Sequence, residues 1–143
     1  MLAVVKGRGR GAVPMTDATG ARRVETPAWM TDFYAKVESK DTEAVLARIA
    51  PGGTFRYGSA DPLTGHDEIR AGVTGLFTHY RWISHEFVNV WAAGSTLLVE
   101  ASATCGCPDG RDITVPTLTI IDHSDGLIDN YRTFIDPTPM QAG

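Results

Sequence analysis

The sequence predicts an α+β fold in which a curved antiparallel β-sheet wraps around N-terminal helices to form a cone. Three observations lead to this prediction. Apolar residues recur at helical spacing in the first half of the ordered chain. Four β-rich segments then follow one another up to residue 136. Their connections contain the Asp-Gly and Gly-Ser pairs that are typical of hairpins. Helices followed by such a meander indicate one α+β domain.

The first half of the chain carries three predicted helices. Thr26-Pro27 suits the start of a helix over 27–39, because Thr caps helices and Pro fits the first turn. Asp41 is predicted to cap a short second helix, which Pro51-Gly52-Gly53 ends. Asp67 is predicted to cap a third helix that reaches about residue 78.

The strands are expected to form a sheet with one face turned toward an internal space. A short strand is predicted at 54–58, before the third helix, and four longer ones follow at 84–93, 96–105, 112–123 and 127–136. A strongly curved sheet around helices leaves a pocket at the open end of the cone. Because side chains alternate along a strand, one parity of each strand should face that pocket.

Composition limits the classes of function. At 143 residues with 43% hydrophobic content, the chain has room for one core, and we expect a single domain over 26–143 behind a disordered extension over 1–25, with Met15 as an alternative start. The net charge of −4 argues against nucleic-acid binding. No apolar run approaches the ~18–20 residues of a membrane span, and a signal peptide would need its basic residues before a longer apolar core, so a cytoplasmic location is predicted.

The cysteines and histidines do not form a metal-binding pattern. Cys105 and Cys107 are interpreted as structural thiols in a reducing compartment. His66, His85 and His123 are interpreted as ordinary loop or strand-end residues, and no pair of histidines has a ligand spacing. We therefore expect neither a metal nor another cofactor.

Four segments together resemble a known superfamily. DFYAKVESKDTEAVLARIA, GHDEIRAGVTGLF, PDGRDITVP and DGLIDNYRTFID, spread over 32–136, resemble the nuclear transport factor 2-like (NTF2-like), or SnoaL-like, proteins. That superfamily forms a cone-shaped α+β barrel and includes ketosteroid isomerases, polyketide cyclases, limonene epoxide hydrolases and non-catalytic binding domains. In register the chain looks most similar to the limonene epoxide hydrolase branch.

The catalytic residues of that branch do not match. Its Tyr and Asn correspond to Arg56 and Gly58, its Arg and first Asp to Glu100 and Ser102, and its second Asp to Thr133. Epoxide hydrolysis by the mechanism of that branch is therefore not expected. The acid and phenol pattern of ketosteroid isomerases is not recognisable either.

The resemblance also implies which residues face the cavity. The expected lining is Tyr34, Arg56, Glu100, Ser102, Thr104, Val115, Thr117, Thr119, Tyr131, Thr133 and Ile135, with His79 near the mouth. A cavity holding an acid, a cation, phenols and hydroxyls differs from a plain apolar core.

These residues suggest a small cofactor-independent enzyme for a hydrophobic oxygenated molecule, such as a polyketide or terpenoid intermediate. Glu100 would move a proton, and Arg56 would tune the pKa of Glu100 or bind an oxyanion. Tyr131 and Tyr34 would orient the substrate oxygen, and the reaction would be an isomerisation, cyclisation or dehydration. The substrate would contact Tyr34, His79, Ser102, Thr117, Thr119, Thr133 and Ile135.

Other interpretations remain open. In one, Arg56 and Glu100 form a structural ion pair, and the protein is a non-catalytic binding module that dimerises through its outer sheet face. In another, the protein is an epoxide hydrolase in which Glu100 activates water. A homodimer is expected from the resemblance in any of these cases.

Overall fold

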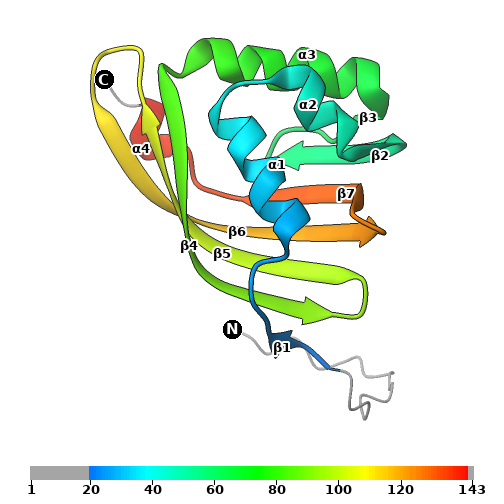
Figure 1. Cartoon of the computed structure of the whole chain (residues 1–143). Coiled ribbons are helices and arrows are strands. Elements are labelled where there is room, and N and C mark those ends of the chain that lie inside the picture. The colour runs from blue at the N-terminus through cyan, green and yellow to red at the C-terminus, as the bar shows by residue number, and fades with distance from the viewer. Residues whose placement is uncertain (1–19, 142–143) are drawn as a thin grey trace, which may run out of the picture.

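The computed structural model describes residues 20–141 as helices packed on one curved sheet (Figure 1). The helices are α1 (Ala28–Glu38), α2 (Thr42–Ala47), α3 (Gly65–His79) and α4 (Thr138–Gln141). The strands are β1 (Arg22–Arg23), β2 (Ile49–Tyr57), β3 (Leu63–Thr64), β4 (Trp82–Ala93), β5 (Thr96–Gly106), β6 (Asp112–Ser124) and β7 (Leu127–Phe134). None of the described helices is both long and apolar enough to cross a membrane.

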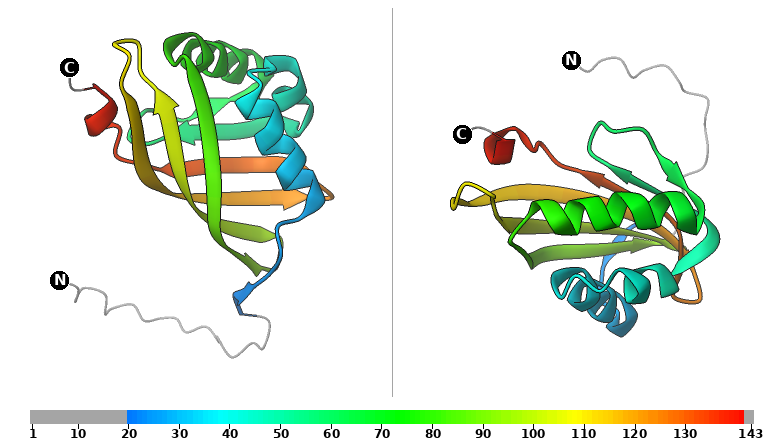
Figure 2. Two further views of the ribbon diagram at one scale, coloured as in Figure 1. Left: turned by 60° about the vertical axis from the view of Figure 1, so that its left-hand side comes forward. Right: turned by 90° about the horizontal axis from the view of Figure 1, so that it is seen from above.

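The sheet has the order β1-β4-β5-β6-β7-β2-β3 and does not close on itself. Strands β4 to β7 form an antiparallel meander, whereas β2 pairs with β7 in parallel. Helices α1, α2 and α3 cover the concave side of the sheet, as the two views in Figure 2 show. The predicted α+β architecture, with a curved sheet wrapped around N-terminal helices, is confirmed.

The core lies between these helices and the concave face. Met30 and Phe33 of α1, Leu46 of α2 and Ile69 of α3 are almost completely buried. Their positions repeat at helical spacing, so that each amphipathic helix places an apolar stripe on the sheet. The first predicted helix is confirmed to within a residue at each end, and the Asp41 side chain caps α2 by accepting from the Ala44 amide at 3.1 Å.

Two predicted helix boundaries are wrong. Pro51-Gly52-Gly53 lies inside β2 and does not end a helix, because α2 stops at Ala47 and the strand begins two residues later. Asp67 does not cap α3, which begins at Gly65 with Thr64 in the N-cap position. There the Glu68 carboxylate accepts from the Thr64 amide at 2.9 Å and so provides an acceptor for the N-cap backbone.

The predicted hairpin connections are confirmed by the backbone of the turns. At the turn between β6 and β7, Asp125 and Gly126 both have positive φ, 53° and 79°. Consecutive positive φ values are typical of the tight turns that match strand twist, and Asp and Gly adopt them at low cost.

Both ends of the described chain hold elements that the sequence pattern did not predict. β7 ends at Phe134 rather than at Asp136, and the short α4 follows with Met140 buried. Arg22–Arg23 forms β1, which pairs with β4 and makes one edge of the sheet. Residues 1–19, which make up most of the predicted N-terminal extension, lie outside the described residues.

Candidate active site

A cavity of about 70 Å³ lies between the helices and the concave face of the sheet. Its wall is mainly aliphatic and aromatic, with polar atoms from a histidine, three tyrosines and three threonines. Among the described residues that form this wall, none is Asp, Glu, Lys or Arg. A ligand in the cavity would therefore meet hydrogen-bonding groups but no permanent charge.

The predicted inward parity of the last two long strands is confirmed. Thr117 and Thr119 of β6 and Tyr131 and Thr133 of β7 are all at most 9% exposed and line the cavity. Ile135, just after β7, lines it as well. These placements agree with the expectation, while the roles of the residues in binding or catalysis stay predictions.

The predicted parity of β5 is wrong. The residues that turn inward are Val99, Ala101, Ala103 and Cys105, so Glu100, Ser102 and Thr104 lie on the outer face. The physical reason is that only this parity buries an uninterrupted apolar row. Glu100 is half-buried, and its Oε1 accepts from Asn89 Nδ2 at 2.9 Å.

Arg56 is likewise on the outer side. It is exposed, and its Nε donates to the carbonyl oxygen of Ala60 at 2.9 Å. The predicted Arg56–Glu100 pair is absent from the described residues, because β7 and β6 lie between β2 and β5 in the sheet. Three steps between neighbouring strands place the two backbones about 14 Å apart. The proposed acid and cation therefore do not meet in the cavity.

Two further predicted contacts lie away from the cavity wall. His79 is exposed in the last turn of α3, where its ring contacts that of Tyr80 edge-on at 4.7 Å. Tyr34 of α1 is 4% exposed and lies behind the wall, with its hydroxyl oxygen 3.3 Å from that of Tyr131. His79 is therefore misplaced as a cavity residue. Tyr34 is not part of the cavity wall itself, but its ring contacts that of His85 edge-on at 4.8 Å.

His85 is the cavity residue that sequence reasoning missed. It lies on β4, two residues after the buried Ile83, and lines the cavity with its side chain 13% exposed. Its Nδ1 is 3.2 Å from Glu38 Oε2, and the same oxygen accepts from the His85 amide at 2.7 Å. The shared parity of Ile83, His85 and Phe87 in the sequence was the signal that could have placed this ring inside.

The electrostatics of His85 favour a neutral ring. Burial lowers the pKa of His85 below its ordinary value of 6.5, and the hydrogen bond and charge of Glu38 oppose this effect only in part. Since a carboxylate can only accept, Nδ1 must carry the proton that it shares with Glu38. Among residues 20–141, His85 Nε2 has no recorded hydrogen-bond partner. The lone pair on Nε2 is therefore available to a ligand.

The end of α1 holds Glu38 in place. Lys40 has a left-handed backbone with φ of 60°, which turns the chain sharply after the helix. Its Nζ donates to the carbonyl oxygens of Tyr80 and Arg81, at the junction between α3 and β4. This contact fixes the α1–α2 turn against the start of the strand that carries His85.

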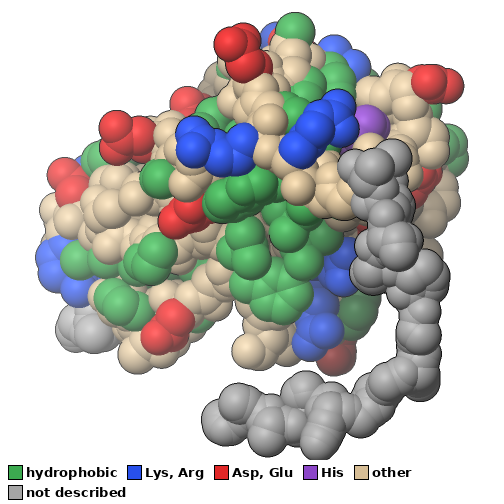
Figure 3. Space-filling view, turned by 90° about the horizontal axis from the view of Figure 1, so that it is seen from below, with side chains coloured by type: hydrophobic (Ala, Val, Ile, Leu, Met, Phe, Trp, Pro, Cys, Tyr) green, Lys and Arg blue, Asp and Glu red, His purple; other side chains and the backbone are tan. Residues whose placement is uncertain are grey.

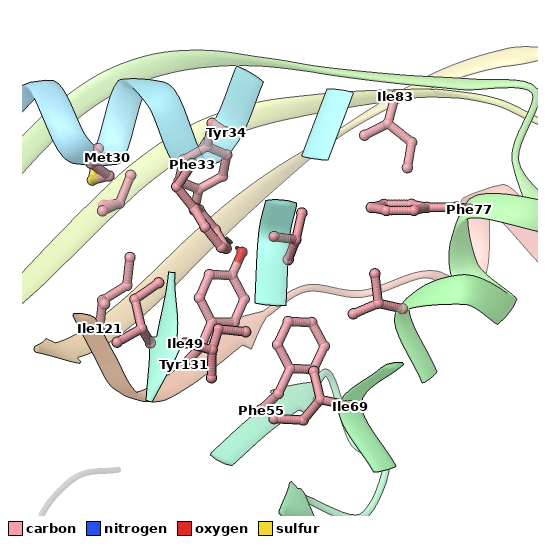
Figure 4. Close-up of a cluster of buried hydrophobic side chains, with 14 of the residues drawn as sticks. Met30, Phe33, Tyr34, Ile49, Phe55, Ile69, Phe77, Ile83, Ile121 and Tyr131 are labelled. Carbon is pink, nitrogen blue, oxygen red and sulfur yellow. Dashed lines mark hydrogen bonds between the residues drawn. The ribbon is translucent and has the colours of Figure 1, made fainter. Parts of the chain in front are cut away.

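Hydroxyl groups gather at one part of the cavity wall. The Tyr34 and Tyr131 hydroxyls are 3.3 Å apart (Figure 4). Beside them on the sheet, Thr119 donates to Thr133 at 2.9 Å. Burial raises the pKa values of both phenols, so both remain protonated at neutral pH. The Tyr131 ring stacks on Phe55 with a centroid distance of 4.9 Å and an angle of 4°, which fixes the direction of its hydroxyl.

The cavity wall also contains Tyr57, Tyr80 and Cys105. Burial raises the pKa of both phenols, and their hydroxyls interact with each other. Burial, with a smaller contribution from Cys107, raises the pKa of the Cys105 thiol to about 11. Both cysteines are free and buried. Within residues 20–141, no three His, Cys, Asp or Glu side chains gather in a way that could hold a metal ion.

Residues 30–131 match the family described as SnoaL-like domain. The chain belongs to this family. The match covers most of the described residues, from α1 to β7, and confirms the resemblance seen in the sequence. No curated protein matches the chain.

Solved structures share the fold. An NTF2-like protein of unknown function from Burkholderia pseudomallei K96243 matches with a TM-score of 0.72 and 18% identity, over 80% of this chain and 95% of its own. A proposed SnoaL-like polyketide cyclase from Jannaschia sp. CCS1 matches with a TM-score of 0.67 and 18% identity, over 84% and 98%. An LEH-like epoxide hydrolase from M. tuberculosis matches with a TM-score of 0.66 and 13% identity, over 78% and 83%. At these identities the likeness establishes the fold alone.

Proposed function

We propose that this SnoaL-like protein is a small enzyme that moves a proton at carbon in a hydrophobic, oxygen-bearing small molecule. The net reaction would be an isomerisation, cyclisation or dehydration, carried out by the side chains of the cavity itself. The observation that carries the proposal is His85, which lines an uncharged cavity while Glu38 binds its Nδ1.

His85 is the proposed general base. Glu38 orients the ring and holds the proton on Nδ1, so that Nε2 can accept a proton from the substrate. Because its pKa lies below 6.5, the ring is neutral and competent at physiological pH. As the proton leaves carbon, Glu38 also stabilises the imidazolium that forms.

The cluster of hydroxyl groups at the cavity is the proposed source of a hydrogen bond to the substrate oxygen. When a proton leaves the carbon next to a carbonyl group, negative charge develops on the carbonyl oxygen. Neutral donors fixed in a dry pocket stabilise such charge more strongly than water does. Tyr131 keeps the role expected from the sequence, which is to help orient the substrate oxygen. The base role passes from Glu100 to His85, and water activation by Glu100 is not retained, because Glu100 lies on the outer face.

A binding module without chemistry is the second candidate, and the size of the cavity favours it. A volume of about 70 Å³ is small for a polyketide or terpenoid ring system, which would require the wall to open. The same pocket would then hold a compact ligand without turnover.

We also propose that the outer sheet face binds a second copy of the chain. Cross-strand neighbours Leu118 and Phe134 are 37% and 54% exposed there. On the same face, Glu100 pairs across the strands with Leu118, and Arg132 pairs with Ile120. A two-fold axis could therefore bring Glu100 of one copy opposite Arg132 of the other. Figure 3 shows apolar side chains exposed between basic and acidic ones in the view from below. Light scattering should give the dimer mass for the wild type and the monomer mass for Phe134→Lys; equal masses would contradict this interface.

The test of the enzymatic proposal uses 3-cyclohexen-1-one, a compact ketone whose carbon acid is flanked by a double bond. Base-catalysed proton transfer converts it into the conjugated ketone, which absorbs in the ultraviolet. We expect His85→Gln to lower kcat/KM by about 10²–10⁴, the usual worth of general base catalysis. The control His79→Gln changes an exposed histidine of the same chain and should leave the rate unchanged.

Each other outcome has a defined meaning. Binding of the ketone without isomerisation would favour the binding module. Equal rates in wild type and His85→Gln would remove His85 as the base and with it the proposed mechanism.

A further inference from the structure

The inner hydroxyl cluster has four O–H groups whose hydrogen-bond acceptors can be counted. It comprises Tyr34, Tyr131, Thr119 and Thr133, and each hydroxyl has one proton to donate. Thr119 donates to Thr133 at 2.9 Å. The two phenols lie 3.3 Å apart, and both interact with the Thr119 hydroxyl. Three of the four protons therefore have acceptors inside the cluster.

The fourth proton belongs to Thr133. Its hydroxyl oxygen accepts from Thr119, and no acceptor for its own proton is recorded among residues 20–141. Its backbone oxygen is already engaged, because it accepts from the Gly58 amide at 2.9 Å. Because Thr133 lines the cavity, this remaining proton is available to a ligand there.

Thr117 provides an internal contrast. It lies on the neighbouring strand β6, lines the same cavity and is buried to the same degree. Its hydroxyl donates to the carbonyl oxygen of Ala101 at 3.3 Å, so its proton is already used. Of these two threonines, only Thr133 has a proton left for a ligand.

The charge of the wall selects the type of acceptor. A carboxylate or phosphate in this cavity would lose its hydration without gaining a cation, because the wall contains no Lys or Arg. A ketone or aldehyde oxygen accepts a hydrogen bond at much smaller desolvation cost. Hydrogen bonds in a row also polarise one another, which strengthens the last donor.

We infer that Thr133 is the residue that binds the carbonyl oxygen of a neutral ketone, with Thr119 and the two phenols aligned behind it. This inference rests on the proposed function and assigns the oxygen-binding subsite of the same cavity. It places the donor to the carbonyl oxygen on β7, while His85 on β4 belongs to another part of the wall. The ligand class is thus a compact uncharged ring that bears one carbonyl group.

The experiment uses cyclohexanone labelled with ¹³C at the carbonyl, which binds without isomerising. Infrared difference spectra report the carbonyl stretch, and that frequency falls when the oxygen accepts a hydrogen bond. We expect Thr133→Val to raise the frequency of the bound ketone and to weaken binding by about 3- to 10-fold, the worth of one neutral hydrogen bond. Thr133→Ser keeps the hydroxyl and should restore both values.

Two controls separate this role from packing. Thr117→Val removes a hydroxyl whose proton is already donated to Ala101, so it should not raise the carbonyl frequency of the bound ketone. Methylenecyclohexane has the shape of the ketone but no oxygen, so its affinity should be equal in wild type and Thr133→Val.

The assignment is overturned if the carbonyl frequency is the same in wild type and Thr133→Val, if Thr117→Val shifts it equally, or if the ketone does not bind. Its failure can be told apart from failure of the proposed function. If His85→Gln abolishes isomerisation while Thr133→Val leaves the frequency unchanged, only the subsite is wrong. If isomerisation survives His85→Gln, the proposed base is wrong whatever the spectra show.

Discussion

Replacing Glu38 by Gln tests the electrostatic coupling on which the proposed base depends. Glu38 Oε2 accepts two hydrogen bonds from His85, at 2.7 Å from the amide and 3.2 Å from Nδ1. Glu38→Gln keeps an oxygen acceptor but removes the negative charge. The Glu38 side chain is 35% exposed, so solvent screens part of its interaction.

The expected effects follow from the contacts. A hydrogen bond to a charged group contributes about 1 kcal/mol more than a neutral one. Glu38 accepts two such bonds, but solvent screens the charge, so Glu38→Gln should lower the free energy of unfolding by about 1 kcal/mol. In the wild type the carboxylate raises the pKa of His85 against the larger effect of burial. Without that charge, the pKa of His85 should fall further below 6.5.

Two measurements check this prediction. Urea unfolding at pH 7 gives the change in stability, and NMR titration of the ring Cε1 proton gives the pKa of His85. The matched control is Glu43→Gln, which removes an exposed carboxylate that pairs with Arg70 and should not move the titration of His85. A pKa of His85 that is unchanged or higher in Glu38→Gln would refute the reasoning.

Four further predictions concern stability and reactivity. The pKa of His85 is lower in the folded protein than in the unfolded chain, so the unfolded chain takes up the proton at a higher pH. The free energy of unfolding should therefore fall as the pH drops below 6.5, and it should fall less in His85→Gln. Urea midpoints at several pH values would measure both. Gly53→Ala places a methyl group about 3 Å from two backbone carbonyl oxygens and should cost about 1–3 kcal/mol of unfolding free energy, while Gly52→Ala, with open space around it, should cost far less. Both cysteines are buried, and the pKa of Cys105 is about 11, so a disulfide reagent at pH 8 should react with them only after urea is added; rapid reaction of the native protein would contradict their burial. Glu100→Gln should leave ketone isomerisation unchanged, and a large loss would return Glu100 to the active site.

The fold was predictable because each level of the sequence agreed with the next. Helical spacing in the first half, β-rich segments in the second and Asp-Gly turns between them all indicate the same architecture. The boundaries that failed are local. Pro51-Gly52-Gly53 resembles a helix terminator, yet it lies inside β2, where the pairing with β7 shifts register between Ile49 and Thr54.

The candidate site was predictable on the strands whose two faces differ in chemistry. On β6 and β7, threonines and Tyr131 were placed correctly. On β5, the run Leu97-Leu98-Val99 begins the strand with apolar residues of both parities. A shift of one residue therefore exchanged the inner and outer sets and brought Glu100 into the predicted site. The contact between Glu38 and His85 joins residues far apart in the chain, and only the tertiary structure reveals it.

The protonation state of His85 tests the central claim most directly, because both the base role and the uncharged cavity depend on it. Long-range ¹H–¹⁵N correlation spectra distinguish the two neutral tautomers of a histidine from its cation. At pH 7 we predict a neutral ring with the proton on Nδ1 and an unprotonated Nε2. A protonated Nε2, whether in the other tautomer or in the imidazolium form, would contradict the account.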